Sequence, residues 1–170
     1  CLLGCAAGPA MGGPIVINEV HYAPKDKTVP EEFVEIYNDG GVAVDLSGWY
    51  FGGGIQWTFA EATSIGPGGF LVVAQDPATI QSIYGPAVPV VGPFSGRLSN
   101  QEDHLVLRNR TGGLEDEVDY RMGFPWPTPG GPQGYSMELI HPDLENDLGG
   151  SWRSSNPGLD QSSDVIGAGE

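Results

Sequence analysis

Hydrophobic residues in this chain recur in short runs, many of which alternate with polar residues, and Gly and Pro separate the runs. Alternation with a period of two is typical of β-strands, because successive side chains point to opposite faces of a sheet. The runs predict about seven to nine short strands spaced roughly ten residues apart. The predicted strands include Ile15–Tyr22, Glu32–Asn38, Val42–Phe51, Ile55–Phe59, Phe70–Ala74, His104–Asn109, Leu114–Tyr120 and Tyr135–Ile140, with a brief edge strand at Val88–Val91.

The first of these strands has an imperfect alternation. Strict alternation would place Val16, Val20 and Tyr22 on one face of the sheet, and Ile15 and Ile17 on the other. Both faces then carry large hydrophobic side chains. The pattern therefore does not settle which face of this strand enters the core.

Two segments contain residues that predict a specific local structure, a helix in one case and a turn in the other. Pro77–Tyr84 is predicted to be a short helix, because Asp76 is a good N-cap, Pro77 suits the first helical position and Gly85 can end it. Within Asp45–Trp49 the aspartate can accept hydrogen bonds from amides two residues further on, so a turn is predicted that brings Trp49 into the core. We expect Trp152 to be a core residue as well.

Many short strands joined by turns favour an all-β fold, an immunoglobulin-like Greek-key β-sandwich with one short helix. The sequence suggests one domain at residues 14–153. We expect residues 1–13, which are small and Gly-rich, to be a flexible tether, and residues 154–170, which lack periodicity, to be a disordered tail.

Charge narrows the range of partners. The chain has 22 acidic and 7 basic residues, a formal net charge of -15. Nucleic-acid binding needs several basic contacts to phosphates, so nucleic acid is not an expected partner. An acidic surface attracts Ca²⁺ and cationic partners, or only keeps the domain in solution.

Both cysteines lie in the first five residues, so neither can link strands of the core. Leu2-Leu3-Gly4-Cys5 resembles a bacterial lipobox, in which the cysteine is lipidated after signal cleavage. Cys5 is therefore a candidate lipidation site, and the alternative is an accidental match. A lipid on Cys5 would be the expected route to the membrane.

A series of motifs, in order, resembles the lamin-tail domain in its bacterial, extracytoplasmic form. These motifs are IVINEVHY, EEFVEIYN, VDLSGW, IGPGGFLVVAQD, LSNQEDHLVLRN, EVDYR, PWP, YSMELI and SW, which span about residues 15 to 152. The resemblance implies an immunoglobulin-like β-sandwich, a secreted or cell-surface accessory module and no catalytic activity. The chain lacks heptads and is acidic, so filament assembly and DNA binding are not transferred from the nuclear members.

Catalytic chemistry has little support in the sequence. His21, His104 and His141 fall on or next to predicted strands, without a G-x-S-x-G elbow or a spacing suited to zinc. The acidic residues Glu19 and Glu35, together with Glu32, fall on strands that are expected to be neighbours. Exposure, or a salt bridge to Arg97, Arg108, Arg121 or Arg153, explains these glutamates better than a metal or a catalytic acid pair.

Two candidate binding sites remain. Asp143, Glu145 and Asp147 alternate as ligands do in calcium loops, although the pattern departs from the EF-hand, and a solvated loop is the alternative. Trp57, Phe124, Trp126 and Tyr135 could form an exposed aromatic platform for a sugar or a protein; alternatively, Trp126 closes one end of the sandwich.

We therefore expect a non-catalytic module, secreted or at a bacterial cell surface, that acts through protein–protein contacts in adhesion or scaffolding. One alternative is a carbohydrate-binding module for wall or environmental polysaccharide. The other is a structural spacer stabilised by calcium, the single cofactor considered.

Overall fold

The computed structural model describes residues 13–127 and 134–155. Its strands are β1 (Ile15–His21), β2 (Phe33–Asn38), β3 (Val44–Asp45), β4 (Tyr50–Gly53), β5 (Ile55–Thr58), β6 (Ser64–Ile65), β7 (Phe70–Ala74), β8 (Val90–Val91), β9 (Ser95–Gly96), β10 (Glu102–Arg108), β11 (Leu114–Arg121), β12 (Met137–Leu139) and β13 (Trp152–Ser154). The helices are α1 (Pro77–Tyr84) and the short 3-10 turn η1 (Gly149–Ser151). An all-β fold with one short helix is confirmed.

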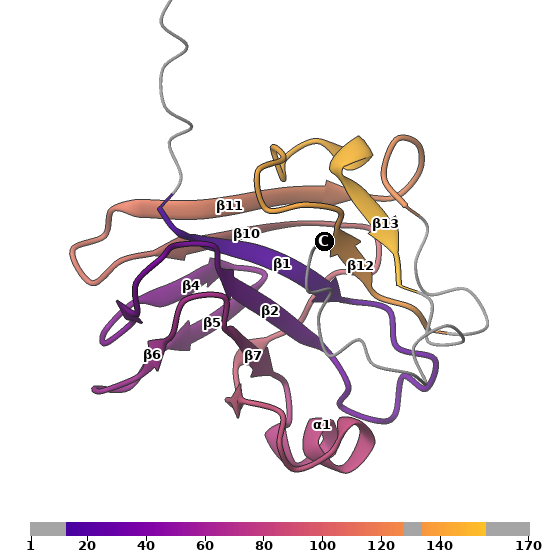
Figure 1. Cartoon of the computed structure of the whole chain (residues 1–170). Coiled ribbons are helices and arrows are strands. Elements are labelled where there is room, and N and C mark those ends of the chain that lie inside the picture. Colours follow the sequence, from indigo (N-terminus) through magenta and orange to yellow (C-terminus); the bar gives the residue numbers. More distant parts are fainter. Residues whose placement is uncertain (1–12, 128–133, 156–170) are drawn as a thin grey trace, which may run out of the picture.

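Two sheets pack face to face (Figure 1). One has the strand order β13-β12-β1-β2-β7-β8 and the other the order β11-β10-β4-β5-β9, while β3 and β6 form a small separate pair. All pairs are antiparallel except β7 with β8. The non-sequential strand orders give the sandwich its Greek-key connections.

A β-bulge in β1 explains the imperfect alternation of its sequence. The pairing of β1 with β2 shifts register between Ile17 and Glu19. Ile15 and Ile17 therefore point into the core on one side of the bulge, and Val20 does so on the other. The prediction that Val16 and Val20 share a face opposite Ile15 and Ile17 is wrong, because strict alternation leaves no room for the extra residue.

The core lies between the two sheets and contains both of the tryptophans that were predicted to be buried. Trp49 follows the predicted turn, where the carboxylate of Asp45 accepts a hydrogen bond from the amide of Ser47 at 2.9 Å. Gly48 in that turn has φ 72°, a conformation that favours glycine. Trp152 on β13 is buried at the other side of the core.

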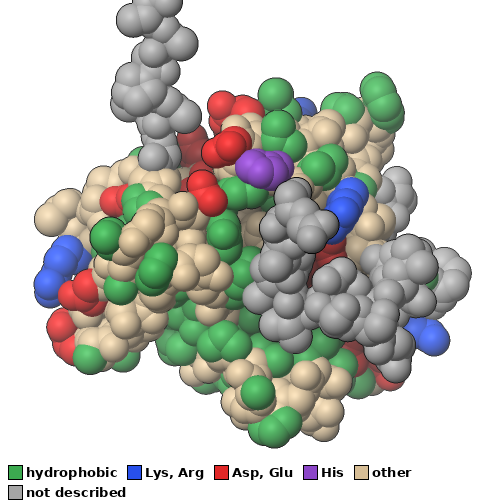
Figure 2. Space-filling model, viewed as in Figure 1, with side chains coloured by type: hydrophobic (Ala, Val, Ile, Leu, Met, Phe, Trp, Pro, Cys, Tyr) green, Lys and Arg blue, Asp and Glu red, His purple; other side chains and the backbone are tan. Residues whose placement is uncertain are grey.

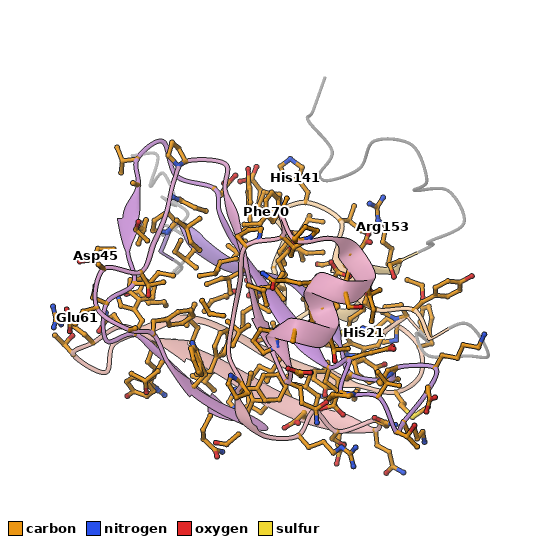
Figure 3. The ribbon with its side chains drawn as sticks, turned by 90° about the horizontal axis from the view of Figure 1, so that it is seen from below. His21, Asp45, Glu61, Phe70, His141 and Arg153 are labelled. Carbon is orange, nitrogen blue, oxygen red and sulfur yellow. The ribbon has the colours of Figure 1, made fainter. Side chains whose placement is uncertain are left out.

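A smaller hydrophobic cluster lies on the outer face of the six-stranded sheet, beneath α1. It consists of Phe33, Val72, Ala74 and Ile80. Seen from below, α1 lies across this face (Figure 3). The helix has the predicted bounds, with the Asp76 side chain accepting from the amide of Ala78 and Gly85 at its end.

The ordered sheet ends slightly beyond the predicted domain. β13 includes Ser154, and the amide of Ser155 donates to the carbonyl of Ser136 at 3.0 Å. The predicted tether, apart from Gly13, and residues 156–170 of the predicted tail lie outside the described residues. No helix in the described part of the chain has the length and hydrophobicity needed to span a membrane.

Candidate functional site

The predicted aromatic platform is not assembled around Trp126, because this side chain is buried. Trp126 is only 6% exposed, and its ring lies 6.3 Å from that of Trp152, measured between ring centroids. The indole nitrogen of Trp152 in turn donates to the carbonyl of Asn146 at 2.7 Å. Trp126 therefore closes one end of the core, which was the alternative reading of its sequence.

The other three aromatic residues do not replace it. Phe124 is fully exposed, at 101%. Trp57 on β5 is partly buried against the core. Phe124 follows β11, and the strands β10 and β4 lie between β11 and β5. Tyr135 is partly buried just before β12. A flat surface for sugar stacking would need several of these rings side by side, and Trp126 cannot contribute to one.

The predicted calcium ligands all lie in the loop 140–148 between β12 and η1. Asp143 lies 3.6 Å from the ring of His141, and a carboxylate oxygen of Asp147 accepts from the amide of Asp119 at 3.0 Å. Within the described ranges, no three acidic, His or Cys side chains converge as metal ligands. Calcium binding by Asp143, Glu145 and Asp147 stays a prediction.

This loop, called the acidic loop below, lines a groove that the sequence did not indicate. The groove, of about 720 Å³, lies between the loop, the start of β1 and the free edge of β11. Figure 2 shows acidic side chains gathered in this upper part of the molecule, next to exposed hydrophobic ones. Its lining includes the carboxylates of Asp39, Asp116, Glu117, Asp143, Glu145 and Asp147, and no Lys or Arg.

Two leucines give the acidic groove an apolar component. Leu114 on β11 is 44% exposed and Leu144 in the loop is 42% exposed, and both line the groove. Contiguous exposed hydrophobic patches with a polar rim are a common feature of protein-binding surfaces. Chemically, the groove suits a ligand that carries both positive charge and apolar groups.

Asp116 holds the wall of the groove together. Its carboxylate accepts from the amide of Ile17 at 2.6 Å and from the side-chain amide of Asn146 at 2.6 Å. The amide of Ile17 lies beyond the β1 residues that pair with β12, which are Glu19 and Val20. Burial raises the pKa of Asp116 to about 6, although these hydrogen bonds act in the opposite direction. Asp116 thus joins β1, β11 and the acidic loop.

A row of three glutamates crosses the outer face of the six-stranded sheet. Glu35 on β2 lies opposite Glu19 on β1, and Glu19 lies opposite Glu138 on β12. The Ser136 hydroxyl donates to Glu19, and Arg153 pairs with Glu138 at 3.1 Å. Burial raises the pKa of Glu35 to about 7, with a hydrogen bond from Asn18 opposing the change and the charge of Glu138 adding to it.

The predicted explanation by salt bridges is confirmed for one of the three glutamates considered in the sequence. Glu32 is 3% exposed and lies 3.3 Å from Arg97. Glu19 and Glu35 instead lie opposite each other, an arrangement of like charges that destabilises a sheet unless it is compensated. Glu138, which extends the row, was not singled out in the sequence.

The three histidines lie in separate places. His21 is buried beside Phe33, with its Nε2 atom 3.0 Å from the carbonyl of Gly134, and burial lowers its pKa. His104 lies 3.0 Å from Glu117 on the neighbouring strand. His141 lies within the acidic loop and pairs with Asp143. In the described ranges, none of them has a serine hydroxyl as a hydrogen-bond partner.

Two packed, mostly antiparallel sheets with Greek-key connections define an immunoglobulin-like β-sandwich, here carrying an acidic groove at one open side. The family model of the lamin tail domain matches residues 9–122. The chain therefore belongs to the lamin tail domain family, and the resemblance seen in its motifs is confirmed. The match includes β11 but ends before the acidic loop, so the groove combines residues from inside and outside the matched region.

Known structures support the fold. The chain is similar to a DUF4876 family protein from Bacteroides thetaiotaomicron VPI-5482, with a TM-score of 0.53 and 12% sequence identity. The similarity covers 85% of this chain and 68% of that chain. The comparison with curated proteins found no match.

Proposed function

We propose that this domain is a non-catalytic interaction module that docks a basic, partly apolar segment of a partner protein in its acidic groove. The observation that carries this proposal is the combination of six carboxylates with two half-exposed leucines in one groove without a basic residue. Acidic surfaces accelerate the encounter with basic partners, while apolar contacts supply most of the affinity. We further propose that the module works outside the cytoplasm, secreted or held at a bacterial cell surface through Cys5.

The edges of the strands beside the groove favour recognition through side chains. The amides of Ile17 on β1 and Asp119 on β11 donate to the carboxylates of Asp116 and Asp147. A peptide that joined either edge as a further strand would have to displace these bonds. We therefore expect the partner to place lysine or arginine side chains against the carboxylates and leucine-like side chains against Leu114 and Leu144.

The other functions considered have less support. A carbohydrate-binding module that relies on aromatic stacking would lack Trp126 as its central ring. A spacer stabilised by calcium would need ligands that converge, and the acidic loop does not gather three of them. The groove does not depend on either feature.

Binding of a fluorescent peptide that alternates lysine and leucine, followed by anisotropy, tests the proposal. The double variant Asp143→Asn, Glu145→Gln removes two groove charges, and Glu61→Gln, Glu102→Gln removes two exposed charges outside the lining. We expect the groove variant to bind at least about tenfold more weakly and the control to bind nearly as the unmodified chain.

Two outcomes would contradict the proposal. Equal weakening in both double variants would mean that the peptide responds only to the overall negative charge. Unchanged binding after Leu144→Ser would remove the apolar part of the recognition. Binding measured at low and at physiological salt separates the two contributions, because only the charge contribution is screened.

A further inference from the structure

A second cleft lies at the opposite end of β1, where three loops meet. The loop between β1 and β2 contributes Pro24, Lys27 and Val29, and Gln75 follows β7. The segment between β9 and β10 contributes Arg97, Leu98, Ser99 and Asn100. The cleft has a volume of about 480 Å³, and the buried carboxylate of Glu32 belongs to its lining. Loops at one end of a sandwich are a frequent location of binding sites.

Glu32 ties the three loops together. Its carboxylate accepts from the amide of Leu98 at 3.0 Å and from Nε of Arg97 at 3.3 Å. Its backbone carbonyl accepts from the amide of Gln75 at 2.8 Å. Burial raises the pKa of Glu32, while the bonds from Leu98 and Arg97 oppose the change. Each oxygen of the carboxylate still has a lone pair for a further donor.

The loops that carry the site are held in place before any ligand binds. In the β1–β2 loop, the amide and hydroxyl of Thr28 both donate to the carboxylate of Asp26, at 2.9 and 2.7 Å. In the β9–β10 segment, the amide of Ser99 donates to Asp103, and the hydroxyl of Tyr120 donates to the carbonyl of Ser99 at 2.8 Å. A site that is already ordered loses little conformational entropy on binding.

Several polar groups in the cleft have no hydrogen-bond partner among the described residues. Among the described residues, the side chains of Lys27, Gln75 and Asn100 make no hydrogen bond, and Arg97 uses only its Nε atom. The chain has two lysines, Lys25 and Lys27, and both lie on the β1–β2 loop. The same loop also carries Asp26, Glu31 and Glu32, while Lys27 and Arg97 are the cations that line the cleft.

We infer that this cleft binds a small ligand that carries a carboxylate flanked by hydroxyl groups, the chemistry of a uronic acid. Lys27 supplies the charge that a carboxylate needs, and the outer nitrogens of Arg97, whose Nε atom pairs with Glu32, supply further donors. Gln75, Asn100 and the free lone pairs of Glu32 supply donors and acceptors for hydroxyl groups. Recognition here rests on charge and hydrogen bonds, so it does not need the aromatic platform.

Calorimetric titration with trigalacturonate tests this inference. The variant Lys27→Gln removes a charge that lines the cleft, and Lys25→Gln removes the same charge from the same loop but outside the lining. We expect Lys27→Gln to weaken binding about tenfold, which is typical of one lost charge-assisted hydrogen bond, and Lys25→Gln to change it by less than about twofold. Circular dichroism melting curves confirm that both variants fold.

Four results would overturn the inference. Trigalacturonate could give no saturable heat, or the two lysine variants could weaken binding equally. Acetate could also bind as tightly as trigalacturonate, which would leave an anion site without sugar recognition. Neutral galactotriose should bind more weakly than trigalacturonate, and equal binding would remove the role of Lys27. The groove variant Glu145→Gln should leave this binding unchanged, which separates the cleft from the protein-binding groove.

Discussion

The burial of Glu35, a member of the glutamate row, predicts that ionisation of its carboxyl group destabilises the folded protein. Glu35 lies between Glu19 and the buried surface of β7 in the six-stranded sheet, opposite Glu19 on one side and Val72 on the other. Its carboxylate accepts a hydrogen bond from Asn18 at 3.0 Å. The substitution Glu35→Gln keeps the shape and this acceptor but can never carry a negative charge.

The magnitude follows from the pKa. Burial raises the pKa of Glu35 from 4.5 to about 7. At about 1.4 kcal/mol per pH unit, the ionised form costs the folded state about 3 kcal/mol relative to the unfolded chain. Between pH 4.5 and 7 the folded protein keeps a proton that the unfolded chain has released. The free energy of unfolding therefore falls as the pH rises through this window.

The assay is urea denaturation of both proteins from pH 4.5 to 8.5, followed by tryptophan fluorescence. We expect Glu35→Gln to gain stability relative to the unmodified chain as the pH rises, by up to about 3 kcal/mol, with no further gain above about pH 7.5. Effects of other groups, such as His21, are present in both proteins and cancel. Glu102→Gln, at an exposed strand position, corrects for the loss of one negative charge. A stability difference that does not change with pH would refute the reasoning.

Further predictions concern buried side chains. Trp126→Ala should lower the free energy of unfolding, measured by denaturation, by about 3–5 kcal/mol, because its side chain is buried. Phe124→Ala should change it by less than about 0.5 kcal/mol. Similar losses in the two variants would contradict the burial of Trp126. Asn38 is fully buried and its amide donates to the carbonyls of Val42, Ile65 and Gly66, so Asn38→Asp would place a carboxylate against these oxygens and should cost at least about 3 kcal/mol at pH 7.5. This loss should exceed that of Asn38→Ala, and the reverse order would show that the carbonyls do not control this position.

The elements of this fold were predictable wherever the signal is local. The helix bounds follow from Asp76, Pro77 and Gly85, each of which has a favoured position at a helix end. The turn before Trp49 follows from Asp45 and the conformational freedom of Gly48. These signals act within a few residues and do not depend on the rest of the chain.

Features that depend on distant partners were not predictable. The amide of Ile17 on β1 donates to Asp116, which lies on another sheet and 99 residues away in the sequence. For Trp126, between two prolines, the sequence allowed both an exposed and a buried position, and the ring of Trp152, distant in the sequence, provides the buried surface.

The groove is a further case, since it joins parts of the chain that share no motif. Its walls come from the start of β1, the turn after β2, β11 and the loop after β12. One local signal was available, because the run Glu115-Asp116-Glu117 is unusually acidic for a β-strand. The partners that make this run a groove wall can be found only in the folded chain.

The capped edge of β11 has a consequence for how copies of this protein behave together. A long unpaired strand normally invites the same strand of another molecule, which is the first step towards fibres. The carboxylate of Asp147 accepts the hydrogen bond of the Asp119 amide on that edge, and Asp116 accepts that of the Ile17 amide nearby. Approaching molecules therefore meet carboxylates where they would need free amide donors. Loss of the Asp147 side chain would free the amide of Asp119, and crowded copies would then be expected to associate through this edge.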